Sequence, residues 1–314
     1  MTQLQKFIQK DKARVDAKIH AYYNSFKKFI CCDELPDFSI QYVDSRQDKN
    51  INYQAQVFPY KSPIILRYNI ATLNENSEYF KYTLVHEFTH LYDYYIQSKN
   101  HDNDFIKRNL MLYTECHAVQ IEILFCYHIV EKITDKAEII KTDLIKILQL
   151  PYIKNKTYTT CVMKFIDNQN TKSFHAMKTS YMYSCGTSLI LSQLLNKEMN
   201  FMDFEKPYDG LMIQARNLLS NIKYNEAPSE NLLTQLGNIN EELNLLFYES
   251  QKNITNNILL KDISKTIPKC PTCGSTNLSK ISNIGKAAKV GLFGIFGAGD
   301  LGKTWKCNSC GSKW

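Results

Sequence analysis

The 314-residue sequence contains no long apolar run and no export signal. No stretch approaches the roughly 20 apolar residues that a membrane-spanning helix needs, so no transmembrane segment is expected. The first thirty residues lack the apolar core and the small-residue cleavage site of a secretory signal peptide. We therefore expect a cytoplasmic protein. In that compartment the six cysteines scattered along the chain would be reduced thiols rather than disulfides.

Acidic residues are scarce in the C-terminal part of the chain. Residues 261–314 hold nine lysines but only two acidic residues, Asp262 and Asp300, an excess of seven positive charges. The formal net charge of the whole chain is also +7, so the preceding 260 residues are neutral overall. A concentrated basic surface attracts polyanions and acidic proteins. A nucleic-acid or protein partner is therefore expected to bind this segment.

The sequence does contain the pentapeptide His86-Glu87-Phe88-Thr89-His90. On a helix, His86 and His90 lie on one face about one turn apart and can bind one Zn²⁺ from the same side. Glu87 lies about 100° round the helix from His86, off the metal but beside a metal-bound water. This is the zinc metalloprotease arrangement, with Glu87 as the catalytic base. Asp93 shares the face of the two histidines and is predicted to orient one of them.

A small sheet is expected before this helix. Residues 38–43, 52–58 and 63–70 have strand character, and Pro63 suits the start of an edge strand. An edge strand just before a metal helix can pair with extended substrate, so residues 63–70 are assigned that role. Most of the remaining chain up to residue 260 has helical apolar spacing. The predicted fold class is α+β: a zincin-like metalloprotease domain with a small sheet and a mostly helical extension, plus a small C-terminal zinc ribbon.

A catalytic zinc needs a third protein ligand, and three residues after His90 can supply it. They are His101 in a polar turn, Glu115 on a predicted helix, and His117 two residues later. Glu115 and His117 are about 200° apart on a helix, so only one of them can face the metal. Ala118, one turn from Glu115, favours a close approach of two helices. The residues alone leave the choice open.

The segment around these residues resembles the mitochondrial ATP-synthase-assembly metalloprotease family. That family has an apolar strand ending in asparagine, then a His-Glu-x-x-His helix with an aromatic residue and Asp after the second histidine. A Ser/Thr-Glu-x-x-Ala helix follows about two dozen residues later. Residues 65–69, 90–93 and 114–118 fit these three features. The resemblance implies a zincin-type peptidase with Glu115 as the third zinc ligand. It covers only about residues 60–125 and lacks the family's cysteine pattern, so it does not imply a mitochondrial function.

A second family, the SprT/Spartan-like proteases, is also similar. These proteases take a third histidine from a His-x-x-x-Phe segment soon after the metal helix, and they end in a zinc ribbon. The segment from His101 to Phe105 fits that pattern. This resemblance implies His101 as the alternative third ligand and DNA-bound proteins as substrates. The long insert before the ribbon departs from that family's layout.

Two Cys-x-x-Cys turns lie near the C-terminus, each followed by glycine: Cys270 with Cys273, and Cys307 with Cys310. Four thiolates close a tetrahedral structural zinc site with no open position. The segment is too small to bury a core of its own, so the metal is expected to supply most of its folding energy. The glycine-rich stretch 285–302 is predicted to form the long hairpin of the ribbon.

These patterns predict three domains: a zincin-like metallopeptidase domain at 1–130, a helical extension at 131–262, and a zinc ribbon at 263–314. The expected function is zinc-dependent cleavage of peptide bonds in a protein or peptide substrate, with one catalytic and one structural Zn²⁺. Two alternatives stay open. One is a SprT/Spartan-like protease acting on DNA-bound proteins. The other is a non-catalytic module whose ribbon recruits nucleic acid or protein.

Overall fold

The computed structural model describes ten stretches of the chain, and these form two compact units, residues 1–247 and 248–314. The described stretches are residues 2–51, 53–127, 129–131, 137–139, 144–195, 208–266, 270–273, 275, 278–280 and 305–312. Within them, no helix has both the length and the hydropathy needed to cross a bilayer.

The chain begins with two helices, α1 (Gln3–Lys10) and α2 (Lys12–Phe29). Thr2 caps α1 in a reciprocal capping box with Gln5, which satisfies free amides of the first turn. The break falls at Asp11, which ends α1 and precedes α2. The apolar side chains of α2 recur every three or four residues, and this stripe is buried in the core.

A three-stranded sheet follows, formed by β1 (Ser39–Val43), β2 (Ala55–Phe58) and β3 (Ile65–Asn69). The strand order is β1-β3-β2, with β1 parallel and β2 antiparallel to β3. The central strand is therefore β3, and its Leu66 and Tyr68 are fully buried. The prediction that residues 63–70 form the edge strand was wrong. Because β2 pairs with β3 on that side, the edge nearest the metal residues belongs to β2.

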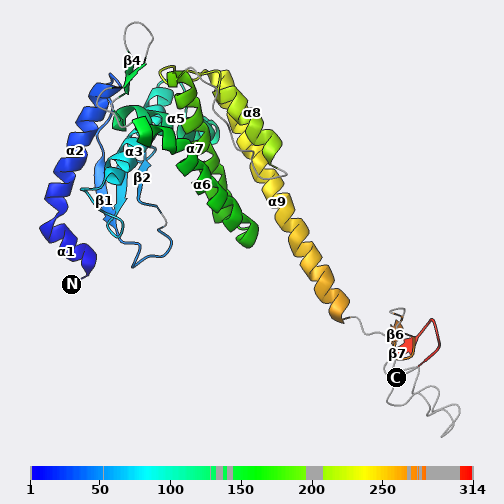
Figure 1. Cartoon of the computed structure of the whole chain (residues 1–314). Coiled ribbons are helices and arrows are strands. Elements are labelled where there is room, and N and C mark those ends of the chain that lie inside the picture. The colour runs from blue at the N-terminus through cyan, green and yellow to red at the C-terminus, as the bar shows by residue number, and fades with distance from the viewer. Residues whose placement is uncertain are drawn as a thin grey trace. The chain divides into compact units, whose positions relative to one another are not determined.

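The pentapeptide lies in the middle of α3 (Glu78–Ser98), which Ser77 caps at its N-terminus. α3 packs against α2, β2 and α5, so it is buried on several sides (Figure 1). The short α4 (Asn103–Asn109) then leads into α5 (Met111–Cys126). α5 contributes buried residues to both apolar clusters of the first unit. The sheet, α2 and α3 belong to the first cluster, and the later helices dominate the second.

The later helices of the first unit share the second apolar cluster with α5. Two short strands, β4 (Ile129–Glu131) and β5 (Ala137–Ile139), precede α6 (Leu144–Asn168) and α7 (Thr171–Leu195). The strand β5 occupies residues predicted to be helical. α7 lies against both α5 and α6. Gly186 allows this approach, because a Cβ atom there would lie 2.3 Å from the carbonyl oxygen of Cys116 on α5.

The chain continues through α8 (Asp209–Leu219) and the long α9 (Glu230–Thr266). The boundary between the two compact units falls inside α9, at residue 248. The second unit also holds an antiparallel pair, β6 (Leu278–Lys280) and β7 (Trp305–Cys307). The predicted hairpin at 285–302 lies outside the described residues. A mostly helical α+β fold with a small sheet is confirmed.

Candidate metal centres

The two histidines of the pentapeptide face the same space beside α3. Their ring centroids are 4.7 Å apart and the rings are perpendicular. Leu84, Phe88 and Leu91 on the same helix pack into the first apolar cluster. This packing fixes the rotation of α3 about its axis and leaves His86 and His90 facing α5 and α7. The predicted spacing on one helical face is confirmed by this geometry.

Glu115 on α5 lies opposite the two histidines. Its Oε2 atom is 3.5 Å from Nε2 of His86 and 3.8 Å from Nε2 of His90. That oxygen is buried and has no hydrogen-bond partner among the described residues. A buried carboxylate oxygen without a partner is costly, unless a cation is bound next to it. The three atoms therefore surround a place that suits a cation.

The two separations that end at Glu115 are close to those expected around a zinc ion. Zn–N and Zn–O bonds of about 2.0–2.2 Å place the ligand atoms of a tetrahedron about 3.3–3.6 Å apart. Glu87 also brings a carboxylate oxygen within 4.8 Å of the two histidines, so the structure offers a second acidic ligand. One oxygen of Glu87 accepts a hydrogen bond from the Val57 amide at 2.7 Å. Glu115 Oε2 is the better candidate because it has no competing hydrogen bond.

The charge states of the histidines follow from their surroundings. Burial lowers the pKa of His90 to about 4, so this ring is neutral at pH 7 and can donate a lone pair to a metal. Burial also lowers the pKa of His86, but its contacts with Glu115 and Glu122 outweigh burial and raise the pKa to about 10. The two carboxylates thus create a negative potential at His86, which favours any cation there.

Both histidines are held through their other ring nitrogen. Nδ1 of His90 lies 2.8 Å from the hydroxyl of Thr114, which donates its own hydrogen to Oδ2 of Asp93 at 2.7 Å. Since the single hydroxyl hydrogen is used there, Nδ1 of His90 must donate, and its Nε2 lone pair is left free. The predicted orienting role of Asp93 is therefore exerted through Thr114. On the other side, Glu122 lies 3.5 Å from Nδ1 of His86.

Glu87 is buried beside these residues. Burial raises the pKa of its carboxyl to about 7, and the nearby His86 and the Val57 amide offset burial only in part. A carboxylate with a pKa near the working pH can both accept and return a proton. The bond from Val57 also ties the carboxylate to β2, the edge strand.

Tyr183 on α7 completes the arrangement, and the sequence contained no motif that indicated it. Its hydroxyl lies 3.3 Å from Nε2 of His86. Burial and the neighbouring carboxylates raise its pKa, so the hydroxyl stays protonated and can donate a hydrogen bond. Tyr183 lies one turn before Gly186, the residue that lets α7 approach α5.

Two cavities meet at His86, Glu87 and Tyr183. The first, about 640 Å³, runs between β2 and the face of α7 that carries Lys172 and His175. The second, about 570 Å³, continues on the other side toward Glu122 on α5 and Lys154 on α6. The metal residues therefore lie within an open groove rather than at the end of a closed pocket.

The other candidate third ligands have different neighbours. His101 stacks on Phe105, with ring centroids 4.2 Å apart, and it is absent from the lining of both cavities. His117 points to the opposite side of α5 from Glu115. Its Nδ1 donates to Asp93 at 2.7 Å and its Nε2 to the carbonyl oxygen of Tyr224 at 2.9 Å. With both nitrogens donating hydrogen bonds, His117 has no lone pair for a metal.

The four C-terminal cysteines form a second candidate centre. Sγ of Cys270 lies 3.5 Å from Sγ of Cys310, and Sγ of Cys273 lies 3.6 Å from Sγ of Cys307. These separations are too long for disulfides, and they approach the roughly 3.8 Å expected between thiolates around one tetrahedral zinc. The hydroxyl of Ser312 helps to lower the pKa of Cys310 to about 6, which favours the thiolate form.

The turn after the second cysteine pair has the conformation that its glycine predicts. Gly311 has a φ of +78°, a value that side chains disfavour, and its amide donates to the carbonyl of Cys307. The amide of Cys307 in turn donates to the carbonyl of Ser312. The corresponding Gly274 lies outside the described residues. The four sulfurs could hold a metal ion.

No family model matches this chain, and no curated protein or solved structure is significantly similar to it. The functional argument therefore depends on the site itself.

Proposed function

We propose that this chain is a zinc-dependent endopeptidase whose catalytic zinc is held by His86, His90 and Glu115. The observation that carries the proposal is the Glu115 Oε2 atom. It is buried, lacks a hydrogen-bond partner among the described residues, and lies 3.5 and 3.8 Å from the Nε2 atoms of the two histidines. One carboxylate and two imidazoles are a common ligand set for catalytic zinc.

When bound, zinc polarises a peptide carbonyl and lowers the pKa of water. Glu87 supplies the proton transfers. Its carboxylate accepts a proton from the attacking water and then donates it to the departing amine. A pKa near 7 suits both steps, and the bond from Val57 holds one carboxylate oxygen in place.

Tyr183 is the proposed donor to the oxyanion that forms on the attacked carbonyl. Its hydroxyl is protonated and lies beside His86 and Glu115, on the side of the site opposite β2. A fixed donor of this kind stabilises the transition state because it needs no reorganisation when the charge develops.

The groove supports internal cleavage of an extended chain. It continues on both sides of Glu87, with room for about 640 Å³ on one side and about 570 Å³ on the other. The edge of β2 that does not pair with β3 lines it, so an extended substrate can add as a further strand beside Ala55. An enzyme that trims chain ends would instead need a wall on one side.

The test is cleavage of an unstructured protein such as casein, with product ends determined by mass spectrometry. We expect internal cuts, inhibition by a zinc chelator, recovery on adding Zn²⁺, and no cleavage by Glu87→Gln. Cleavage by Glu87→Gln at the wild-type rate would contradict the mechanism. Release of single terminal residues would contradict the endopeptidase assignment.

The SprT/Spartan-like alternative requires His101 as a ligand. No contact in the described part of the chain supports that role, since His101 stacks on Phe105. We further propose that the basic C-terminal segment binds a nucleic acid or an acidic protein. Binding of residues 261–314 to DNA that weakens as salt is added would support it.

A further inference from the structure

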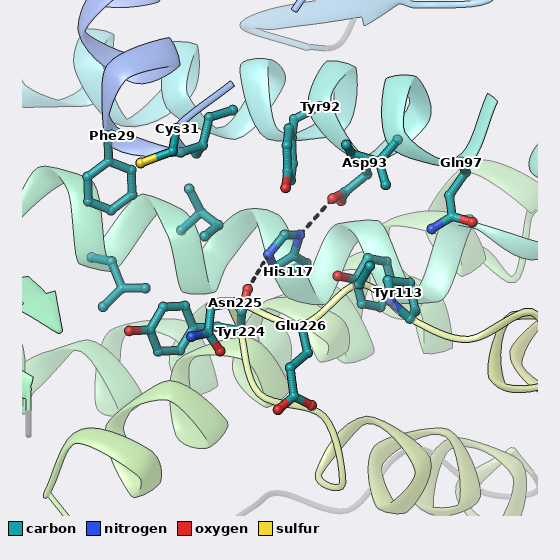
Figure 2. Close-up of a pocket in the computed structure, with 16 residues that line it drawn as sticks. Phe29, Cys31, Tyr92, Asp93, Gln97, Tyr113, His117, Tyr224, Asn225 and Glu226 are labelled. Atoms are coloured by element: carbon teal, nitrogen blue, oxygen red, sulfur yellow. Dashed lines mark hydrogen bonds and ion pairs between the residues drawn. The ribbon is translucent and has the colours of Figure 1, made fainter. Parts of the chain in front are cut away.

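A third cavity, of about 430 Å³, lies on the opposite side of α5 from the metal residues. Helices α3 and α5 form its base, and the end of α2 and the segment 224–228 form its rim (Figure 2). Its volume is within the range of small-molecule sites, which span roughly 300–1,000 Å³. None of the catalytic residues proposed above lines it.

The inner wall is built around His117, whose two ring nitrogens both make hydrogen bonds. Figure 2 shows its ring between Asp93 on α3 and the backbone oxygen of Tyr224. Both partners are acceptors, so both ring nitrogens carry hydrogen and the imidazole is a cation. The Asp93 carboxylate balances that charge. This pair ties the rim segment to α3 and α5 and gives the cavity a fixed shape.

Two further polar side chains of the wall have no partner. Gln97 and Tyr113 are only 6% and 5% exposed, and both line the cavity. No hydrogen bond from the side-chain amide of Gln97 or the hydroxyl of Tyr113 to another described residue is found, and neither group is among the polar atoms that are fully closed off from solvent. Both groups therefore open onto the cavity, where a bound molecule can pair with them. They therefore indicate a ligand with a hydrogen-bonding head.

The rest of the lining selects the charge and shape of that ligand. Ile96, Ile121 and Leu124 supply an apolar wall, and Tyr92 adds an aromatic one. Glu226 stands at the exposed rim with a negative charge. Because Asp93 and His117 cancel, Glu226 leaves the lining with a net negative charge. The cavity thus disfavours carboxylates and phosphates and favours a cation.

From these features we propose that the cavity binds a small organic cation that has a flat apolar body and an amidine-like or amine head. The body packs on the apolar wall. The head donates hydrogen bonds to the side-chain oxygens of Gln97 and Tyr113 and is attracted by Glu226. This cavity shares only Asp93 with the residues that hold the proposed zinc ligands, and the proposal does not depend on the peptidase assignment.

Three molecules of the same shape test the charge preference: benzamidine (cation), benzamide (neutral) and benzoate (anion). Their dissociation constants for the zinc-loaded full-length chain are measured by titration calorimetry. We expect benzamidine to bind about fivefold or more tighter than benzamide, because its head makes charge-assisted hydrogen bonds. We expect no saturable binding of benzoate at this cavity. Equal binding of benzamide and benzamidine, or no binding of benzamidine, would overturn the proposal.

Two pairs of variants locate the site. Glu226→Gln and Gln97→Leu should each weaken benzamidine binding about fivefold, the worth of about one hydrogen bond or ion pair. Their controls are Glu230→Gln, which removes the same charge four residues later, and Ser98→Ala on the exposed face of α3. Neither control residue lines the cavity. Glu226 is exposed, so its substitution leaves the fold intact. If neither variant differs from its control, benzamidine binds elsewhere and the assignment fails.

Discussion

The two candidate metal centres of this chain are built in opposite ways. At the first, His86, His90 and Glu115 come from helices that pack into an apolar core with no help from a metal. At the second, two short turns bring Cys270, Cys273, Cys307 and Cys310 together beside the strand pair β6–β7, and Cys270 and Cys307 are the only buried side chains among the described residues of that unit. The first centre is open to a groove, and the second uses all four ligand positions.

This difference predicts a different role for a metal ion bound at each centre. A site that the core holds in place can leave one coordination position free for substrate, and it keeps its geometry when the metal is absent. Where the metal supplies the folding energy that a hydrophobic core would otherwise supply, each ligand is needed for folding. Such a site cannot leave a coordination position free for substrate. Removing metal should therefore stop chemistry at the first centre and remove structure at the second.

The largest expected effect is on the cysteine site. Cys273→Ser or Cys310→Ser should unfold the ribbon, because loss of one thiolate removes most of the roughly 10–16 kcal/mol that a structural zinc provides. The body, residues 1–247, should keep its melting transition. Limited proteolysis with and without chelator measures both. A ribbon that is equally protected in both conditions would show that the metal does not hold it together.

The next effect is chemical rather than structural. Glu87→Gln should lower the rate of peptide cleavage by about a thousandfold, since the amide cannot accept a proton from water. The variant should keep the fold and both metals. Steady-state kinetics and circular dichroism test the two halves of this statement. Loss of the fold together with activity would mean that Glu87 has a structural role instead.

A smaller effect is expected where α7 meets α5. In Gly186→Ala, the new methyl group would lie 2.3 Å from the backbone oxygen of Cys116, so α7 must move and carry Tyr183 with it. We expect a loss of about 1–3 kcal/mol in the free energy of unfolding and a lower rate of cleavage. Gly210→Ala on α8 is the control, because nothing lies within 4 Å of its Cβ position.

In that control, the free energy of unfolding should stay unchanged or rise, as alanine favours helices. Urea unfolding of both variants gives the comparison. Equal stability of the two would mean that the contact between α5 and α7 adjusts without cost, and that Tyr183 is not held by Gly186.

The smallest effect concerns the orientation of His90. Thr114→Val keeps the shape of the side chain but removes the hydroxyl that links His90 to Asp93. Zinc affinity at the first centre should fall by about tenfold, the lower end for loss of an orienting partner. Competition with a zinc-binding dye measures it. Thr160→Val, on the exposed surface of α6, should leave the affinity unchanged.

The features that could be predicted from sequence are those with local causes. The spacing of His86 and His90 follows from the helical period, and the turn at Gly311 from a short motif. The edge of the sheet could not be predicted, because it depends on β2 pairing with β3 from a distance. Tyr183 and Glu122 reach the site only through the packing of α5 and α7, which no local pattern records.

The choice between Glu115 and His101 shows the same limit. Each lies within a plausible local motif, and only the packing of α3 on α5 brings Glu115 to the two histidines. His117 shows the same limit of sequence-based prediction, because its hydrogen-bond partner Tyr224 is 107 residues away along the chain. Pairings over such distances depend on the whole core rather than on any short stretch.

Zinc content per chain tests the central claim most directly. After exhaustive dialysis, the wild-type protein should carry two zinc ions, Glu115→Ala one, and His101→Ala two. Each variant is checked for an unchanged fold before the metal is measured. One zinc in the wild-type protein would leave only the cysteine site. Loss on His101→Ala with retention on Glu115→Ala would contradict the assignment of Glu115 and favour the SprT/Spartan-like alternative.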